Sequence, residues 1–392
     1  MVFVSLSAER LRRRRGPILL IQIIFFWFSL YTYPAILTPY LTEMGASLTS
    51  AGLVVGSYGL TQTLLRLPAG LWSDRLHNKR IFVIAGMFLS LISAVGLLYS
   101  RQIATILIFR AVAGMAAATW VHSSTLYLAY QPAGQGAKAM GILNFLCNIG
   151  TMAAMLTGSL LAQSLGWHSS FLVAVIIAAI GCILSFFISE DKPVVAERQS
   201  AAAARHTAGL SLNRQLVWTS LLALLSQFCT FATVQGFVPQ YASFLGANKA
   251  QIGLLTALST LPCAVAGLLG GGLLARHFRL RSLIVTGYLL TGVATCLLPL
   301  IHVLPLLFVC QIIAGIGFGF QVTLLMSLCT QTVPAERQAS AMGFFQAVYG
   351  IGMVAGPVLI GLLADWFGLG AGFILIGVIA LLSGLLARIV LL

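Results

Sequence analysis

The sequence predicts an all-α membrane protein with twelve transmembrane helices in two pseudo-symmetric six-helix bundles. Three observations support this fold class. Hydrophobic residues make up 59% of the 392 residues and charged residues only 8%, whereas a soluble domain carries about 25% charged residues. Apolar runs of about 20 residues, the length that crosses a bilayer, recur along the whole chain. The two halves of the chain also resemble each other at a nearly constant offset.

Twelve apolar runs separated by short polar turns define the expected spans. They are residues 17–41, 50–71, 79–99, 102–127, 139–164, 168–189, 215–242, 250–274, 281–301, 303–330, 339–364 and 369–391. The first run follows the basic stretch RLRRRR at 10–15, but it is too long for a secretory signal peptide and has no small-residue cleavage site. We therefore expect it to span the membrane. Kinks are expected at Pro34, Pro39, Pro239 and Pro262.

Basic residues gather in alternate loops, which predicts the orientation of the chain. The N-terminal arginines, the turn at 75–80 and the turn at 276–281 would lie on one side, while the opposite loops hold only Arg101 and Lys249. The positive-inside rule places the basic side in the cytoplasm. We expect a multi-pass protein of a bacterial inner or cell membrane with both termini cytoplasmic. The same alternation argues against nucleic acid as a partner, despite the net charge of +14.

Four segments make up the expected domain organisation. They are a cytoplasmic tail (1–16), an N-terminal six-helix bundle (17–189), a polar, Ala/Ser-rich cytoplasmic linker (190–214) and a C-terminal six-helix bundle (215–392). RAVAG at 110–114 aligns with QIIAG at 311–315, an offset of 201 residues, and LLAQSLG at 160–166 aligns with LLADWFG at 362–368, an offset of 202. Two such repeats, related by an axis along the membrane normal, can rock about a site between them.

The turn after the second span carries the most specific motif. GLWSDRLHNKR at 70–80 resembles motif A of the major facilitator superfamily of secondary transporters, and RAVAG, with Arg110, resembles its motif B. His77 stands where that family usually has a second glycine, and the second copy, GGLLARHFRLR at 271–281, has Ala275 in place of the aspartate. The resemblance covers essentially the whole chain. It implies the twelve-helix fold and alternating access.

A second family motif, associated with export, departs from the usual pattern. The resemblance would place a Gly-Pro pair in the fifth span, but Gly150, Ala154 and Gly158 occur there without a proline. The pair stands instead in the eleventh span, at Gly356 and Pro357. This departure weakens an inference of antiport from motifs alone.

A gating role is expected for the motif A residues together with a nearby arginine. The set is Gly70, Asp74, Arg75, Lys79, Arg80 and Arg66. We expect Asp74 to act as a latch on the cytoplasmic side by pairing with Arg75 or with a basic group of a neighbouring helix. The basic residues also anchor the topology, which is the simpler account of their presence.

The resemblance implies that spans 1, 2, 4, 5, 7, 8, 10 and 11 line a central cavity. Polar and aromatic residues on these spans are the candidate substrate-binding set: Arg110, Tyr33, Tyr58, Gln62, Trp120, Asn144, Asn148, Gln227, Gln235, Gln311, Gln346 and Tyr349, with Tyr31 and Gln321 beside them. Taken singly, such residues more often join helices than contact a ligand. As a set they present amides, aromatics and one cation without a fixed anion, which favours neutral, amphipathic or anionic substrates.

The coupling ion is left open by the sequence. None of the eight acidic residues falls at the middle of a span, although proton-coupled carriers often use a carboxylate there. His122 is the candidate proton carrier because histidine titrates near neutrality, and a hydrogen-bonded packing role is its alternative. Arg110 is expected to bind an anion or to take part in coupling, with bonding to neighbouring helices as its alternative.

The expected function is secondary active transport of a small organic solute by rocker-switch alternating access, with export of organic or amphipathic compounds favoured. Uptake or exchange of an organic anion on Arg110 is the alternative, and a non-transporting receptor or a lipid scramblase on the same scaffold is a further one. No nucleophile and base cluster together, so an enzyme is not expected. The seven cysteines lie inside apolar runs without a CxxC pair, so neither a metal nor another cofactor is expected. The expected partners are the solute and the lipid bilayer, and the chain is expected to be a monomer.

Overall fold

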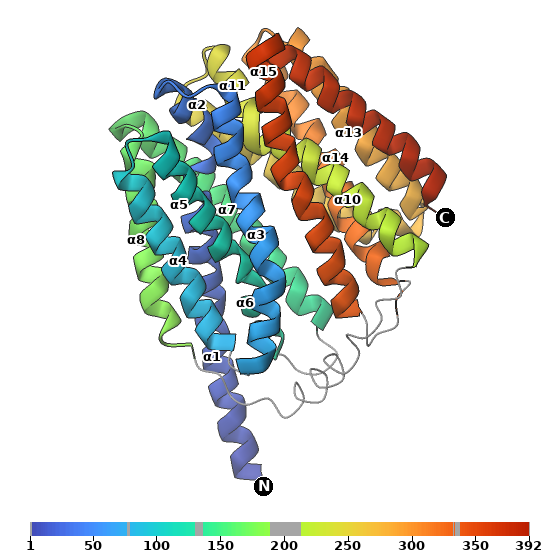
Figure 1. The fold of residues 1–392 in the computed structure, drawn as a ribbon. Coiled ribbons are helices and arrows are strands. Elements are labelled where there is room, and N and C mark those ends of the chain that lie inside the picture. The colour runs from blue at the N-terminus through green and yellow to red at the C-terminus, as the bar shows by residue number, and fades with distance from the viewer. Residues whose placement is uncertain are drawn as a thin grey trace.

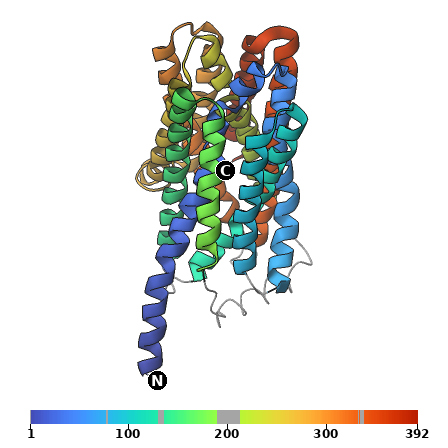
Figure 2. The same cartoon turned by 90° about the vertical axis from the view of Figure 1, so that its left-hand side faces the viewer.

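The computed structural model describes residues 2–76, 79–129, 136–188, 213–331, 333 and 338–391. Within these ranges every regular element is helical, and the helices form two bundles (Figures 1 and 2). The N-terminal half contains α1 (Val2–Tyr31), α2 (Pro34–Glu43), α3 (Leu48–Leu76), α4 (Lys79–Tyr99), α5 (Ile103–Ala118), α6 (Trp120–Ala129), α7 (Gly136–Leu165) and α8 (His168–Ser185). The C-terminal half contains α10 (Arg214–Ala232), η1 (Thr233–Phe237), α11 (Val238–Phe244), α12 (Lys249–Gly271), η2 (Leu274–Arg276), α13 (Leu280–Leu297), η3 (Leu298–Leu300), α14 (Leu304–Gln331) and α15 (Gln338–Val390).

These helices coincide with the twelve predicted spans to within about five residues, except that α1 begins at Val2, well before the predicted start at residue 17. The third span matches α4 in full, and the eleventh and twelfth spans are the two parts of α15, which breaks at Gly368. Nine helical segments of the described chain are long and apolar enough to cross a membrane, with residues 341–390 counted as one segment. The all-α membrane fold is therefore confirmed. The predicted linker lies, up to residue 212, outside the described residues.

The first span of each half is broken at an equivalent place. α1 ends at Tyr31 and α2 begins at Pro34, while α10 passes through the π-helix η1 before α11, which carries Pro239. Proline interrupts a helix because it lacks a backbone N–H and its ring clashes with the preceding turn. The kinks expected at these two prolines are thus found as helix breaks. Pro39 and Pro262 lie inside α2 and α12 without ending them.

Four glycines with positive φ mark one end of the bundle. Gly45, Gly166, Gly246 and Gly368 have φ values of 87°, 86°, 83° and 80°. A glycine adopts this left-handed conformation without the steric cost that a Cβ would bring. Each of them follows a helix on the side drawn at the top of Figure 1. We call this side the closed end and the opposite side, where α1 begins, the terminal end.

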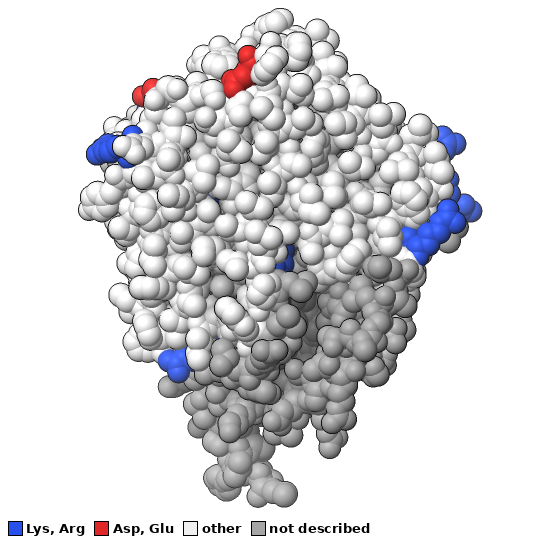
Figure 3. Space-filling view, in the orientation of Figure 1, with Lys and Arg blue, Asp and Glu red and all other residues white. Residues whose placement is uncertain are grey.

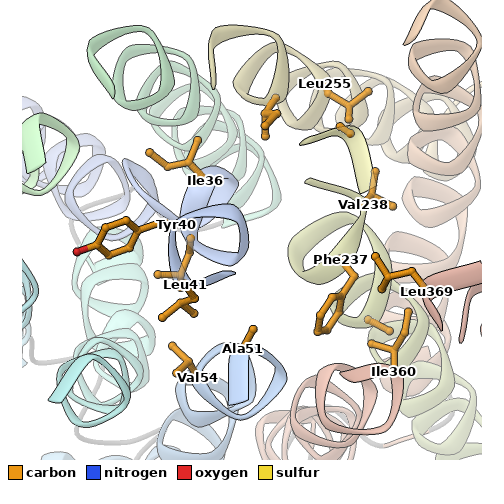
Figure 4. Packing of buried hydrophobic residues seen from close by; sticks show 14 of the residues in the cluster. Ile36, Tyr40, Leu41, Ala51, Val54, Phe237, Val238, Leu255, Ile360 and Leu369 are labelled. Carbon is orange, nitrogen blue, oxygen red and sulfur yellow. The ribbon is translucent and has the colours of Figure 1, made fainter. Parts of the chain in front are cut away.

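The two halves pack together at the closed end. One hydrophobic cluster there draws residues from both halves (Figure 4), with Ile36, Tyr40, Leu41, Ala51 and Val54 from the first and Phe237, Val238, Leu255, Ile360 and Leu369 from the second. Two hydrogen bonds add to it, from Thr38 Oγ1 to the Gly236 carbonyl at 2.5 Å and from Thr42 Oγ1 to Gln240 Oε1 at 3.2 Å. We call these residues the closed-end cluster.

Towards the terminal end the packing is mostly within each half. One cluster around Leu283, Phe320 and Phe345 belongs to the C-terminal half, and one around Leu19 and Val83 belongs to the N-terminal half. Two further contacts join the halves. α3 packs against α15, where a Cβ at Gly59 would press on Met353 and one at Gly350 on Thr63. A separate cluster packs Phe231 and Met353 of the second half with residues of the first half that include Phe26 and Tyr58.

The outer surface has the character of a lipid-facing belt. Large apolar side chains such as Leu160, Ile176, Val293 and Leu382 are exposed on it. In Figure 3 the described surface is largely uncharged, with acidic side chains near the top and basic side chains mainly at the left and right margins. An apolar belt of this kind is stable in a bilayer because the helices satisfy their own backbone hydrogen bonds.

The glycine of the RAVAG motif tests the tight packing of α3 against α5. A Cβ at Gly114 would overlap the Tyr58 carbonyl oxygen and the Thr61 hydroxyl. We predict that Gly114→Val destabilises the fold by about 1–3 kcal/mol, the usual cost of overpacking, and lowers the melting temperature of the purified protein. Gly343→Val is the matched control, because a Cβ at Gly343 meets nothing within 4 Å. Equal melting temperatures for the two variants would contradict this packing.

Candidate functional site

A cavity of about 340 Å³ lies between the two halves. Its walls come from α1, α6 and α7 of the first half and from α10, η1, α12, α13 and α14 of the second. The lining residues are Trp27, Tyr31, Trp120, Asn144, Cys147, Asn148, Thr151, Gln227, Thr230, Thr233, Val234, Gln235, Ser259, Thr260, Cys263, Thr291, Ala314, Gly315, Phe318 and Val322. The volume is within the range of small-molecule binding sites, about 300–1,000 Å³.

The closed-end cluster caps this cavity. Along the first span the cavity residues Trp27 and Tyr31 come before the helix break, and the cluster begins after it, at Tyr33. Along α12, which starts at the closed end, the cluster residues come first and the cavity residues Ser259 to Cys263 follow. The helix breaks at 32–33 and in η1 thus lie at the boundary between the cap and the cavity.

The cavity wall carries no charged side chain among the described residues. Its polar groups are amides, hydroxyls and thiols, and its largest apolar surfaces are aromatic. The Trp27 and Trp120 rings meet edge to face with centroids 5.3 Å apart, and Trp27 and Tyr31 lie 5.6 Å apart. Aromatic faces next to amides and hydroxyls suit a solute with both an apolar face and hydrogen-bonding groups.

Two polar groups of the wall lack an oxygen or nitrogen partner within the described structure. Gln227 is only 9% exposed, and its Oε1 accepts no hydrogen bond. The Trp27 indole N–H is equally without such a partner, although the Cys147 thiol, a weak acceptor, lies beside it. Buried polar groups are normally paired, so these two groups on residues of the cavity wall are candidates for hydrogen bonds to a ligand after a change of rotamer.

Five of the twelve predicted substrate-binding residues meet in this cavity. They are Trp120, Asn144, Asn148, Gln227 and Gln235, and Tyr31 joins them. The other seven lie outside its lining: Arg110, Tyr33, Tyr58, Gln62, Gln311, Gln346 and Tyr349. None of the described residues of α3 and α15 lines the cavity. These two helices pack directly against each other where the halves meet.

Arg110 is buried behind the cavity wall. It is 4% exposed, and its Nη1 donates to the Tyr33 hydroxyl at 3.1 Å. Its Cζ lies 4.3 Å from the centroid of the Tyr58 ring and 5.3 Å from that of Tyr33. No described acidic side chain forms an ion pair with it, so the π faces of two tyrosines stabilise the cation. Tyr31, which lines the cavity, lies next to Tyr58 and so connects the cavity wall to this cluster.

The predicted glutamines outside the cavity lining differ in how completely they are hydrogen-bonded. Gln321 is fully bonded: its Oε1 accepts from Ser226 at 2.5 Å and its Nε2 donates to Thr291 Oγ1 at 2.9 Å. This network joins α10, α13 and α14 behind the cavity. Gln62 and Gln311 are 6% and 2% exposed, and the Oε1 atom of each has no partner among the described residues.

Part of the predicted gating set is in contact at the terminal end. Arg66 Nη1 donates to the Tyr349 hydroxyl at 3.0 Å, which joins α3 to α15 across the two halves. Arg80 Nη2 donates to the Phe186 carbonyl at 2.7 Å, at the C-terminal end of α8, where a cation is favourable. Asp74 and Arg75 lie on the last turns of α3, but their side chains, like that of His122, are outside the described part of the chain. The predicted Asp74 latch therefore stays a prediction.

The sequence did not predict most of the threonine, serine and cysteine residues that line the cavity. The missed polar residues are Trp27, Cys147, Thr151, Thr230, Thr233, Ser259, Thr260, Cys263 and Thr291. One signal was present: Trp27 precedes Tyr31 by four residues and therefore shares its helix face. Hydroxyl and thiol side chains carry no comparable signal, because they also bond to the carbonyl of the preceding helical turn, as Thr233 does with Cys229.

The fold and the cavity together define a membrane transport protein with two repeated bundles. The model of the Major Facilitator Superfamily matches residues 18–248 and 222–392, and the chain belongs to this superfamily of secondary transporters. It is 24% identical over 338 residues to an uncharacterized MFS-type transporter of Methanocaldococcus jannaschii, over 85% of this chain and 87% of that one. A probable sugar efflux transporter of Mannheimia succiniciproducens is 22% identical over 320 residues, which cover 80% and 77% of the two chains.

A solved structure has the same fold. It is the crystal structure of a bacterial homologue of the human lysosomal transporter Spinster in an inward-facing and occupied conformation. Its TM-score with this chain is 0.79 at 16% sequence identity, with 97% of this chain and 96% of that one covered. The likeness extends over both halves, so it confirms the arrangement of two six-helix bundles.

Substitution of Gln227 and of Gln321 tests which of these two glutamines stabilises the folded protein. We predict that Gln321→Leu lowers stability by about 1 kcal/mol, because Ser226 and Thr291 lose their partner. Gln227→Leu should leave the melting temperature without added solute nearly unchanged, because no described group bonds its Oε1. Thermal unfolding of both variants in the same detergent measures the difference. A larger loss for Gln227→Leu than for Gln321→Leu would contradict the assignment.

Proposed function

We propose that the protein is a secondary active transporter that exports a small uncharged organic solute through rocking of its two halves. The observation that carries the proposal is the cavity between the halves, capped at one end and lined by uncharged polar and aromatic residues of both. Membership of the superfamily supports transport. The amides, hydroxyls and indoles of the wall support an uncharged solute with an apolar face.

The proposed orientation follows from the charge distribution. The described basic residues of the terminal end include Lys79, Arg80, Arg279 and Arg281, whereas Arg101 and Lys249 lie at the closed end. The positive-inside rule then places the terminal end, and both chain termini, in the cytoplasm. With the closed end outside, the cavity belongs to an inward-facing state, which is also the state of the Spinster homologue. Loading from the cytoplasm fits export, and the sugar efflux relative supports this direction.

An organic anion is the second candidate substrate, and Arg110 supports it. This arginine is the one described cation of the N-terminal half that is buried inside the bundle, and its Nε has no partner there. Arg110 is not among the residues that line the cavity, and its guanidinium packs on the Tyr58 ring. An anion in the cavity would therefore reach the guanidinium only after a rearrangement of the wall. An uncharged solute can contact the polar and aromatic side chains of the wall without such a change, so the uncharged solute is favoured.

A ligand-stabilisation screen separates these candidates. Purified protein is melted at two pH values with sugars, polyols and nucleosides, with organic anions and with lipophilic cations. We predict stabilisation by an uncharged compound, because binding to the folded state raises the melting temperature by mass action. Arg110→Gln should keep this stabilisation, and Gln227→Leu should weaken the affinity about tenfold through the loss of one hydrogen bond.

Two outcomes of the screen would contradict the proposal. Stabilisation by organic anions alone, abolished in Arg110→Gln but kept in the control variant Arg101→Gln, would establish the anion alternative. Stabilisation by lipophilic cations alone would exclude both substrate classes. Reconstituted protein that moves no solute but moves labelled lipid between leaflets would show a scramblase, and binding without movement of either would show a receptor.

A further inference from the structure

The N-termini of two equivalent helices face the opposite half at the closed end. α3 of the N-terminal half begins at Leu48, and α12 of the C-terminal half begins at Lys249, an offset of 201 residues. The first backbone N–H groups of a helix have no acceptor within that helix. Their acceptors at these two corners of the molecule come partly from the other half.

At the first corner the acceptor is a carboxylate. Asp365 lies on α15 just before the break at Gly368, and its two oxygens each accept one backbone N–H of α3, from Leu48 and from Thr49, both at 2.9 Å. Charged acceptors make stronger hydrogen bonds than neutral ones, and a negative charge is favourable at the positive end of the helix dipole. This contact joins the two halves.

At the second corner the acceptor is an amide. Gln163 of α7 is the residue equivalent to Asp365 in the two aligned segments at 160–166 and 362–368. Its Oε1 accepts a single backbone N–H, from Lys249, at 3.0 Å. α12 also carries its own capping box, in which Asn248 and Gln251 bond each other's backbone. The Lys249 ammonium adds a cation–π contact with Trp167 at 3.8 Å.

A glycine brings the helices together beneath each acceptor. A Cβ at Gly361, one turn before Asp365, would press on the Leu48 carbonyl at 2.5 Å. A Cβ at Gly253, one turn after Lys249, would overlap the Ser159 side chain. At both corners a glycine permits close approach and a side chain of one half caps a helix of the other, although Gly361 lies on the acceptor's helix and Gly253 on the capped helix. The two corners also differ in the charge of the capping side chain.

We infer that Asp365 and Gln163 are positioning residues that set how readily the closed end opens during transport. The inference rests on the proposed rocker-switch cycle. Their cross-half hydrogen bonds exist only while the closed end is shut, so they stabilise that state and no other. The carboxylate, with two bonds and a charge, holds its corner more strongly than the amide with one bond. The resting state is thereby biased towards a shut closed end.

Distances between spin labels at both ends test this inference. One pair joins Tyr99→Cys and Val303→Cys at the closed end, and another joins Phe187→Cys and Phe278→Cys at the terminal end. All four native side chains are exposed, and the seven native cysteines are replaced by serine. Pulsed electron resonance on protein in lipid nanodiscs, without added solute, gives the populations of open and shut states at each end.

The expected result is reciprocal at the two ends. Asp365→Asn should raise the population with the closed end open roughly tenfold and shorten the terminal-end distance, as the loss of a charged cap predicts. Asp365→Glu should restore part of the shut population. Gln163→Glu should shift the population the opposite way, because it adds a charge at the α12 N-terminus. Gln102→Glu is the control: it adds a charge at the exposed start of α5, within one half.

Three outcomes would overturn the inference. They are unchanged distances in folded Asp365→Asn, a closed-end change without a change at the terminal end, and equal shifts in Gln163→Glu and Gln102→Glu. The proposed function is tested separately by solute flux. If the distances shift but the protein moves no solute, the role of Asp365 and Gln163 stands and the proposed transport is refuted. If the variants transport solute at the wild-type rate and the distances do not shift, transport stands and the role of the two residues is refuted.

Discussion

The packing of the two halves against each other at one end is the constraint on which the rest of the structure depends. The closed-end cluster, the bonds from Thr38 and Thr42 and the two cross-half helix caps all lie there. The apolar clusters nearest the terminal end stay within their own halves. Beside the cluster that packs Phe231 and Met353 against the first half, part of the space between the halves is left as the cavity. Alternating access requires that the packing at the closed end be reversible.

The polar chemistry of the interior is divided between the cavity and its surroundings. Gln321, which joins three helices, has its partners within the protein, whereas Gln227, a residue of the cavity wall, has an Oε1 atom without a partner among the described residues. Arg110 differs from both. Its charge is held by tyrosine rings in place of a carboxylate, which keeps the cation within the N-terminal half and leaves the cavity wall uncharged. The related position in the other half, Gln311, carries no charge, so the two halves are not chemically equivalent.

The sequence predicted the fold well because the bilayer imposes a simple rule on it. The length and spacing of the apolar runs suffice to locate the spans, and α4 is found at its predicted bounds. The candidate site was predicted in part. Amides such as Asn148 were identified because they are rare and costly in apolar spans, but helix rotation decides which of them reach the cavity. Tyr33 and Tyr58 were predicted to line it and are found around Arg110, because the break before Pro34 and the close approach of α3 and α5 direct them there. No pattern in a single span reveals such contacts between helices.

Covalent closure of the closed end tests the central claim most directly. Thr42 and Gln240 face each other across the halves at 3.2 Å, so Thr42→Cys with Gln240→Cys, in a background without the native cysteines, allows a reversible crosslink. Once a transported solute is known, its flux is measured in proteoliposomes before oxidation, after oxidation and after reduction. If the halves rock about the cavity, the crosslinked protein binds solute but does not move it, and reduction restores the flux. Undiminished flux through fully crosslinked protein would contradict the account.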